Sequence, residues 1–246
     1  MVTSEIQTTQ VEITSENLTI PAYLAVPQGE GPFPAVVVLQ EIFGVNAHIR
    51  SITERLAQAG YVAIAPALYQ RLAPNFEAGY TPADIAIGRQ YKEQTKAAEL
   101  LADIQGAIAH VQKLPMVKGK SCGCIGFCFG GHVAYLAATL PDIQATASFY
   151  GAGITTWTPG GQSPTVELTA DIKGPLYAFF GMEDASIPTA QVNQIEAELQ
   201  RYQVPHQVFR YDGADHGFFC DQRASYNLEA AADAWEKVKQ LFHETL

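Results

Sequence analysis

The sequence predicts an α/β fold in which a mostly parallel central sheet is flanked by helices. Short apolar runs alternate along the chain with longer segments whose apolar residues recur at helical spacing. Some of the short runs, among them PAVVVLQ and YVAIAP, are apolar almost without interruption, as expected of strands buried on both faces. This alternation is typical of a sheet with helices packed against it.

The expected elements follow one another from the N-terminus. A hairpin-like region covers residues 11–27. After it we expect strands at 34–40, 61–66, 121–127, 145–151, 174–181 and 206–212. Helices are expected at 47–60, 130–140, about 189–202 and at the C-terminus, with one long helical stretch from about Pro82 to Lys113. The helix at 47–60 ends on Gly60, a natural C-cap residue.

The composition favours a single domain over residues 1–246. With 48% hydrophobic and 16% charged residues, the chain can bury one sizeable core. The sequence has no internal repeat and no linker rich in proline, serine and glycine. We expect a monomer or a small homo-oligomer.

The charge of the chain argues against a nucleic-acid partner. The formal net charge is −10 and the pI is near 5.0, whereas phosphate backbones are bound by clustered lysines and arginines. The polar start, MVTSEIQTTQVEIT, lacks the pattern of a signal peptide, and no stretch approaches the roughly 18 apolar residues of a membrane span. We therefore expect a cytoplasmic protein with no membrane partner.

Three of the four cysteines lie in one predicted strand and the turn that follows it. Cys122 and Cys124 would point to the same face of that strand. SCGC is a poor zinc signature, because no second pair of cysteines or histidines stands at a regular distance from it. We expect buried structural thiols here, and we predict no disulfide framework, no metal and no cofactor.

Four chemically active side chains come directly after predicted strands, where the functional groups of such sheets gather. They are Glu41 after PAVVVLQ, Cys128 after SCGCIGF, Asp184 after PLYAFFG, and His216 after HQVFRYD. Nucleophile, acid and histidine occur in the order used by hydrolases with a nucleophile elbow.

Each candidate also has a simpler interpretation. A free cysteine is commonly a small buried hydrophobe, but the glycines of GFCFGG flank Cys128 at the offsets that a strained strand-to-helix elbow requires. Asp184 could act as an N-cap or turn residue. Among six histidines, only His216 lies in a glycine-bounded loop after a strand. The arrangement of the residues therefore favours a catalytic site.

These residues resemble the dienelactone hydrolase family, a branch of the α/β-hydrolase superfamily with a Cys-His-Asp triad. The resembling segments span nearly the whole chain in the family's order: QEIFGVNAHIR, GYVAIAPALYQR, GFCFGGHVA, YGAG, GMEDASIP and DGADHGF. EIFG and the cysteine elbow are the most specific of them. The resemblance implies an α/β-hydrolase fold and carboxymethylenebutenolidase-like hydrolysis of a small ester or lactone. The expected binding partner is therefore this small-molecule substrate.

The resemblance also assigns roles to the catalytic candidates. Cys128, at the positive end of the helix that follows it, would attack the carbonyl and form an acyl-thioester. His216 would act as the base, and Asp184 would accept the other imidazole proton. In this fold two backbone N–H groups bind the oxyanion, and we assign them to Ile42 and Phe129.

The family further implies roles for an acid and for substrate-binding residues. The glutamate that matches Glu41 holds the resting thiol protonated and is displaced when substrate enters. The type substrate is an anionic lactone bound by arginines and a tyrosine, for which our candidates are Tyr91, Arg89 and Arg223. Where the type enzyme has an arginine one turn after the catalytic histidine, this chain has Cys220, and Arg223 is the candidate replacement.

Two alternatives accompany this interpretation. Within the hydrolases, the chain could be a general carboxylesterase or thioesterase. Outside them, it could be a redox thiol protein in which Cys128 pairs with Cys122 or Cys124. The second alternative gives Asp184, His216 and Glu41 no role.

Overall fold

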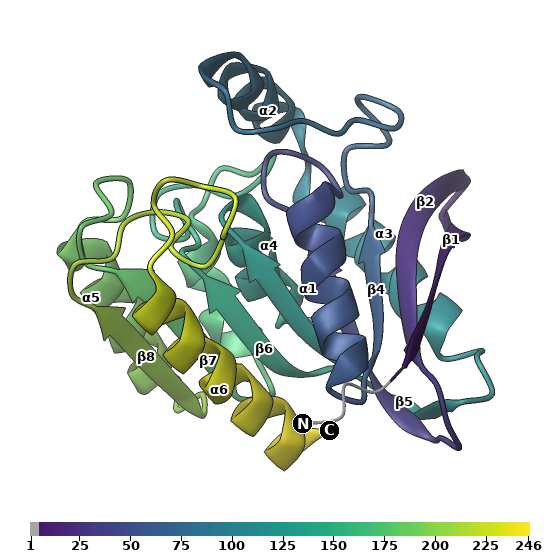
Figure 1. Ribbon diagram of the computed structural model, residues 1–246. Helices are drawn as coiled ribbons and strands as arrows, with labels where there is room; N and C mark the ends of the chain where they lie inside the picture. The colour runs from purple at the N-terminus through teal and green to yellow at the C-terminus, as the bar shows by residue number, and fades with distance from the viewer. Residues whose placement is uncertain (1–4) are drawn as a thin grey trace.

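An eight-stranded sheet forms the centre of the protein, with the strand order β1-β2-β4-β3-β5-β6-β7-β8 (Figure 1). This computed structural model describes residues 5–246. The strands are β1 (Ile6–Ser15), β2 (Leu18–Pro27), β3 (Phe33–Leu39), β4 (Val62–Pro66), β5 (Val117–Phe127), β6 (Ile143–Phe149), β7 (Leu176–Gly181) and β8 (His206–Tyr211). The helices are α1 (Ala47–Gln58), α2 (Pro82–Gln94), α3 (Ala97–Val111), α4 (Phe129–Ala137), the 3-10 helix η1 (Thr165–Asp171), α5 (Thr189–Arg201) and α6 (Leu228–Thr245).

The sheet is mostly parallel. β1 and β2 form an antiparallel hairpin, and β2 also pairs antiparallel with β4. Every pair from β4 through β3, β5, β6 and β7 to β8 is parallel. The predicted fold class is confirmed, as are the hairpin and each of the predicted strands.

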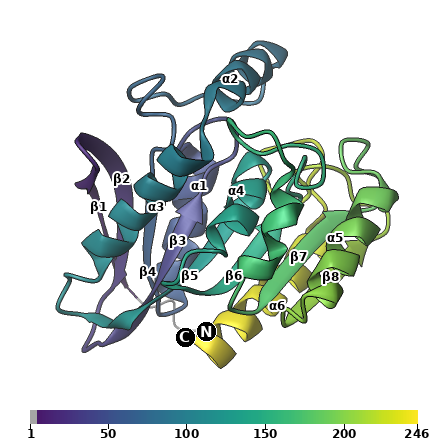
Figure 2. The same cartoon turned by 180° about the vertical axis from the view of Figure 1, so that it is seen from behind.

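Helices cover both faces of the sheet, which explains the uninterrupted apolar strands. α1 and α6 lie on one face (Figure 1), and α3, α4 and α5 lie on the other (Figure 2). Successive residues of β3 face opposite sides: Val36 packs in the same cluster as Ile52 of α1, whereas Val37 packs with Ile104 of α3. Both valines are fully buried.

Helix α1 begins and ends as its sequence predicts. The Asn46 side chain accepts a hydrogen bond from the N–H of Ile49 and caps the N-terminus. Gly60 follows the last turn with a φ of +95°, a conformation that favours glycine. The predicted role of Gly60 is confirmed.

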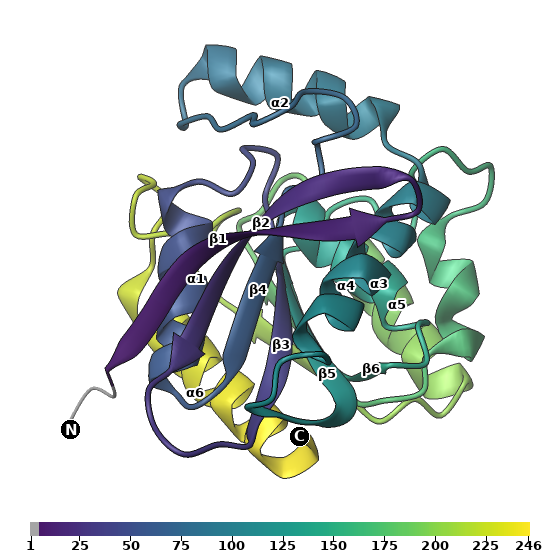
Figure 3. The same ribbon diagram turned by 90° about the vertical axis from the view of Figure 1, so that its right-hand side faces the viewer.

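The long helical stretch predicted from Pro82 to Lys113 is wrong in one respect, because it is two helices. Thr95 has an extended backbone, and its hydroxyl donates to the carbonyl of Lys92 at the end of α2. The N–H of Ala97, in the first turn of α3, donates to the carbonyl of Pro159. Because of this break, α2 does not continue into α3. Helix α2 crosses above the sheet as a separate element (Figure 3).

The 3-10 helix η1 was not predicted from the sequence. It lies in the connection between β6 and β7, two parallel neighbours that need a crossover.

Within residues 5–246, no helix combines the length and the apolar character that a membrane crossing requires.

Candidate active site

Cys128 occupies a sharp turn between a strand and a helix. It follows the last residue of β5 and directly precedes α4, with a φ of +56° and a ψ of −116°. A non-glycine residue at such a φ is strained. The turn is fixed by its neighbours, since Cys128 N–H donates to Phe149 (3.0 Å) and the Cys128 carbonyl accepts from Gly131 N–H (3.0 Å).

Three glycines allow the chain to approach itself closely around this turn. A Cβ added to Gly126 would overlap the carbonyl oxygen of Gly130. One added to Gly130 would overlap the backbone of Leu39, and one added to Gly131 would overlap the carbonyl of Phe149. The glycines of GFCFGG therefore permit the contact of α4 with β3 and β6 that exposes Cys128 at the turn.

His216 and Asp184 form a hydrogen-bonded pair beyond the ends of two adjacent strands. Asp184 follows β7 and His216 follows β8, and these strands pair in parallel. His216 Nδ1 lies 2.7 Å from Asp184 Oδ2. Asp184 is 3% exposed. The other carboxylate oxygen accepts from Ser186 through its backbone N–H (2.9 Å) and its hydroxyl (2.5 Å).

Ser186 is a residue that sequence reasoning missed. The Asp-x-Ser spacing in GMEDASIP is the available signal, because a carboxylate commonly bonds to the backbone two residues onward. Ser186 fixes Oδ1 and leaves Oδ2 to His216. The Ser186 hydroxyl also lies 3.2 Å from His216 Nδ1.

The electrostatics of the pair favour a protonated histidine. Burial opposes a charge on His216, but the negative charge of Cys128 and the hydrogen bond to Asp184 outweigh it and raise the pKa of His216 to about 10. For Asp184, burial is likewise outweighed by His216 and Ser186, so the pKa of this carboxyl falls below its usual value. The site can therefore hold an imidazolium between a carboxylate and the sulfur.

One cavity of about 540 Å³ brings most of the predicted residues together. Its wall contains Ile42, Phe43, Ile85, Arg89, Lys92, Glu93, Cys128, Phe129, Ala152, Asp184, Ala185, Ser186, Asp215, His216 and Arg223. The wall thus draws on loops after β3, β5, β7 and β8 and on one side of α2. Glu41 and Tyr91 do not belong to it.

The residues of the two expected oxyanion donors line the same cavity as Cys128. Phe129 is the first residue of α4, where N–H groups have no partner within the helix and carry partial positive charge. Ile42 follows β3 and also lines the cavity. Within residues 5–246, neither N–H finds a hydrogen-bond acceptor. Both groups are therefore available to a ligand.

Glu41 lies behind the cavity wall and is fully buried. Its Oε1 accepts from Nη1 of Arg223 at 3.3 Å, and in the described part of the chain no hydrogen bond joins it to Cys128. Burial raises the pKa of Glu41, against the opposing effect of Arg223 and His216. The carboxyl is thus paired with Arg223 and sits in the field of His216.

The candidate substrate-binding residues have different surroundings. Arg223 lines the cavity, with its guanidinium 6.0 Å from the ring centre of Phe43 and 5.7 Å from that of Tyr80. Arg89 lines the cavity from the exposed side of α2.

Tyr91, like Glu41, is a predicted site residue that does not line the cavity. Its ring packs against Phe76 (4.9 Å between centroids) and Tyr69 (5.8 Å). The reason is helical register, since Arg89 and Lys92 occupy the side of α2 that faces the cavity. Sequence reasoning missed Lys92.

Comparison with known proteins identifies the family. Residues 20–246 match the model of the dienelactone hydrolase family. The chain belongs to this family. It is 61% identical over 244 residues to a Synechocystis sp. protein provisionally named carboxymethylenebutenolidase, with 99% of each chain covered. An Escherichia coli K12 protein with the same provisional name is 32% identical over 237 residues, which cover 94% of this chain and 85% of that protein.

Solved structures agree with this membership of the dienelactone hydrolase family. The crystal structure of a provisionally assigned dienelactone hydrolase from Klebsiella pneumoniae has a TM-score of 0.88 and 33% sequence identity, and covers 97% of this chain and 99% of its own. The predicted resemblance is confirmed, and so is the α/β-hydrolase fold. The chain is a hydrolase of the dienelactone hydrolase type, which disfavours the redox alternative.

Proposed function

We propose that this chain hydrolyses small carboxylic esters or lactones through an acyl-thioester on Cys128. One observation carries the proposal: Cys128, in its strained elbow, lines the same cavity as the hydrogen-bonded pair of His216 and Asp184. A thiol attacks a carbonyl as the thiolate, and a neighbouring imidazolium and a helix N-terminus both stabilise that anion. In the reactive state the thiol proton resides on His216.

Acylation begins when the Cys128 sulfur attacks the carbonyl carbon of the ester. The carbonyl oxygen becomes an oxyanion, which accepts hydrogen bonds from the N–H groups of Ile42 and Phe129. The carbon–oxygen bond of the ester then breaks, and the leaving alkoxide takes the proton from His216. In a lactone the alcohol formed in this way stays attached to the acyl group.

Deacylation reverses the proton transfer. A water molecule gives one proton to His216 and attacks the thioester carbonyl, and the same two N–H groups stabilise the second oxyanion. The carbon–sulfur bond breaks, the acid leaves, and the thiolate–imidazolium pair is restored. Asp184 fixes the imidazole tautomer throughout, and Ser186 holds Asp184 in place.

Glu41 restrains the resting nucleophile in this proposal. A carboxylate that reaches the thiol of Cys128 keeps it protonated, and entry of substrate displaces it. The ion pair with Arg223 gives Glu41 a second position in which to reside. This arrangement limits idle oxidation of the sulfur, because oxidation proceeds through the thiolate.

The cavity offers cationic contacts to a small substrate that carries negative charge. Arg89, Lys92 and Arg223 line it, against the acids Glu93, Asp184 and Asp215. Asp184 is already paired with His216, and Arg223 is paired with Glu41, so Arg89 and Lys92 are the cations without a partner among these groups. A volume of about 540 Å³ suits a small-molecule ester or lactone.

A panel of anionic lactones, neutral lactones, aryl esters and thioesters tests this function. We expect hydrolysis of lactones or esters by the purified protein, and Arg223→Gln should raise KM for anionic substrates about ten- to hundredfold, the loss expected for one charge-assisted contact. Arg201→Gln, which alters an exposed arginine on α5, is the matched control. No hydrolysis of any ester or lactone contradicts the proposal, and a preference for thioesters supports the thioesterase alternative.

A further inference from the structure

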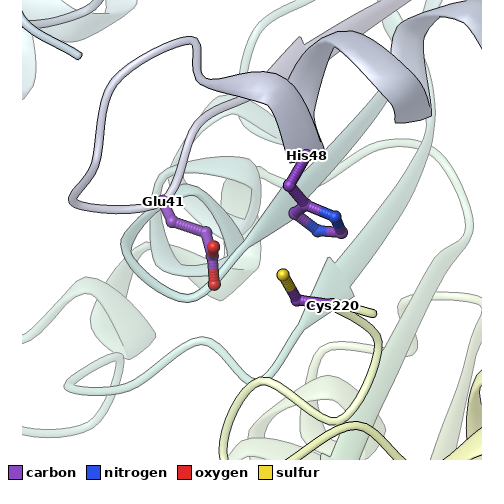
Figure 4. Close-up of side chains that lie close together, drawn as sticks. All are labelled: Glu41, His48 and Cys220. Atoms are coloured by element: carbon purple, nitrogen blue, oxygen red, sulfur yellow. The ribbon is translucent and has the colours of Figure 1, made fainter. Parts of the chain in front are cut away.

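Three buried side chains from distant parts of the sequence meet beside the catalytic cavity. Glu41 comes from the loop after β3, His48 from the first turn of α1, and Cys220 from the loop before α6 (Figure 4). One carboxylate oxygen, one imidazole nitrogen and the Cys220 sulfur all lie within 4.8 Å of one another. The exposed fractions of the three residues are 0%, 2% and 0%.

Two of the three groups have polar atoms without a partner. Within the described chain, neither Oε2 of Glu41 nor Nε2 of His48 has a hydrogen-bond partner, although both atoms are buried. Such atoms are uncommon in folded proteins, where nearly all buried polar groups are satisfied. Both belong to residues of the same cluster. A bound cation would satisfy them together.

We propose that Glu41, His48 and Cys220 bind a divalent ion of the zinc class. Thiolate, imidazole nitrogen and carboxylate oxygen are the ligand types that Zn²⁺ uses, and three protein ligands leave the fourth tetrahedral position to water. Bond lengths of about 2.0–2.3 Å to the ion place the donor atoms roughly 3.3–3.7 Å apart. The donor atoms, now within 4.8 Å of one another, must therefore move closer together for all three to bind the ion.

The charges of the cluster balance such an ion. On binding, the Cys220 thiol loses its proton to solvent and a sulfur–metal bond forms. The thiolate and the Glu41 carboxylate then offset the two positive charges of the ion, and Arg223, which is paired with Glu41, leaves the group with one net positive charge. Arg223 contacts Oε1 of Glu41 and Oε2 is left for the metal, so with the ion bound Glu41 does not also reach the Cys128 thiol.

Two hydrogen-bonded residues outside the proposed ligand set, Tyr80 and Asn46, lie next to the Cys220 sulfur. The Tyr80 hydroxyl lies 3.3 Å from Sγ of Cys220 and accepts from Nδ2 of Asn46 at 3.1 Å. The Tyr80 hydroxyl proton can therefore be donated to the sulfur once Cys220 is a thiolate. Outer groups of this kind orient metal ligands.

One of the three proposed ligands, His48, also borders a cavity that does not contain Cys128. A second cavity, of about 300 Å³, has His48 in its wall, together with the acids Asp221 and Glu236. Arg55 lines it as well, with its guanidinium 4.3 Å from the ring centre of Trp235. Carboxylates at the wall favour the entry of a cation.

Titration with Co²⁺ tests the site, and it reads binding rather than hydrolysis, so its result does not depend on the proposed function. We expect one equivalent to bind and a thiolate-to-cobalt charge-transfer band to appear in the near ultraviolet. Zn²⁺ should displace the cobalt and abolish the band. Absence of stoichiometric binding by wild-type protein would overturn the proposal.

The competing thiol at Cys128 provides the decisive control, because it also lies beside a histidine. The band should persist in Cys128→Ala and be absent from Cys220→Ser. His48→Gln, a second variant, should weaken Zn²⁺ binding by more than about 100-fold, since loss of an outer-shell partner alone costs about 10- to 100-fold. The opposite pattern, with the band lost in Cys128→Ala and kept in Cys220→Ser, would assign the ion to the catalytic histidine and overturn the proposal.

Discussion

At the scale of single residues, the site depends on a sulfur and a histidine that stabilise each other's charge. Cys128 is held at a φ of +56° and lines the cavity with His216. The histidine in turn is tied to Asp184 at 2.7 Å. The strain at Cys128 persists because the close backbone contacts of the flanking glycines fix the elbow.

We predict that His216 stays protonated at neutral pH in the arrangement of this structure, where Glu41 is paired with Arg223 and not with the Cys128 thiol. Its pKa is raised from 6.5 to about 10, with burial opposing and the charges of Cys128 and Asp184 prevailing. Because the folded pKa is the higher one, the resulting stabilisation is complete below about pH 6.5 and is lost as the pH rises through about 10. NMR titration of the ring proton should show this, and Cys128→Ala should lower the His216 pKa.

Two other histidines serve as internal references in the same spectra. Burial lowers the pKa of His48 to about 3 and that of His132 to about 4, so both rings should remain neutral. A wild-type His216 that titrated near 6.5 would contradict the prediction.

We predict that Glu41→Gln has different effects on the rate of ester hydrolysis and on the rate of Cys128 alkylation. The glutamine keeps the shape of the side chain but removes the carboxylate, so ester hydrolysis should slow. Alkylation of Cys128 by iodoacetamide without substrate should stay as fast or become faster, because His216 and the N-terminus of α4 still favour the thiolate. A parallel fall in both rates would make Glu41 part of the base, and no change in either would make it a bystander.

At the scale of elements, the elbow between β5 and α4 follows from the short motif GFCFGG, which can be recognised in the sequence. Glycines on both sides of Cys128 leave room for α4 to touch the backbone after β3 and β6. A strand-turn-helix unit is local, so apolar runs and glycine spacing predict it well.

Other elements depend on contacts between segments that are far apart, and these could not be predicted. The break before α3 is fixed by Pro159, which accepts from Ala97 across the fold. Glu41 and Arg223 are separated by 182 positions, so no spacing rule joins them. The cluster of Glu41, His48 and Cys220 was also missed. Cys220 is far from the other two residues in the sequence, and the prediction of no metal considered only the spacing of the cysteines.

We predict that Gly130→Ala damages the elbow. Its Cβ would overlap the backbone oxygens of Leu39 and Gln40, which cannot move aside as a flexible side chain can. Urea unfolding should show a loss of about 1–3 kcal/mol or more, with a loss of hydrolysis. Gly161→Ala, an exposed site whose Cβ meets only Thr158 at 3.1 Å or beyond, should stay within about 0.5 kcal/mol. Equal effects at both glycines would contradict the close-packing explanation.

At the scale of the whole molecule, the sheet assembles the site from loops that are remote in the sequence. The loops after β3, β5, β7 and β8 emerge at one end of the parallel strands. Helix α2 crosses above that end and contributes Arg89 and Lys92 to the cavity (Figure 3). The sequence indicates the strand ends, whereas the position of α2 depends on the break at Thr95.

The most direct test of the account is to trap the acyl-enzyme. Wild-type protein mixed with an aryl ester and quenched in acid should gain the mass of one acyl group, and peptide mapping should locate that group on Cys128. His216→Ala should hydrolyse the ester at least about 100-fold more slowly. Cys220→Ser should still acquire the acyl group on Cys128. An acyl group on another residue, or turnover that continues in Cys128→Ala, would contradict the assignment of Cys128 as the nucleophile.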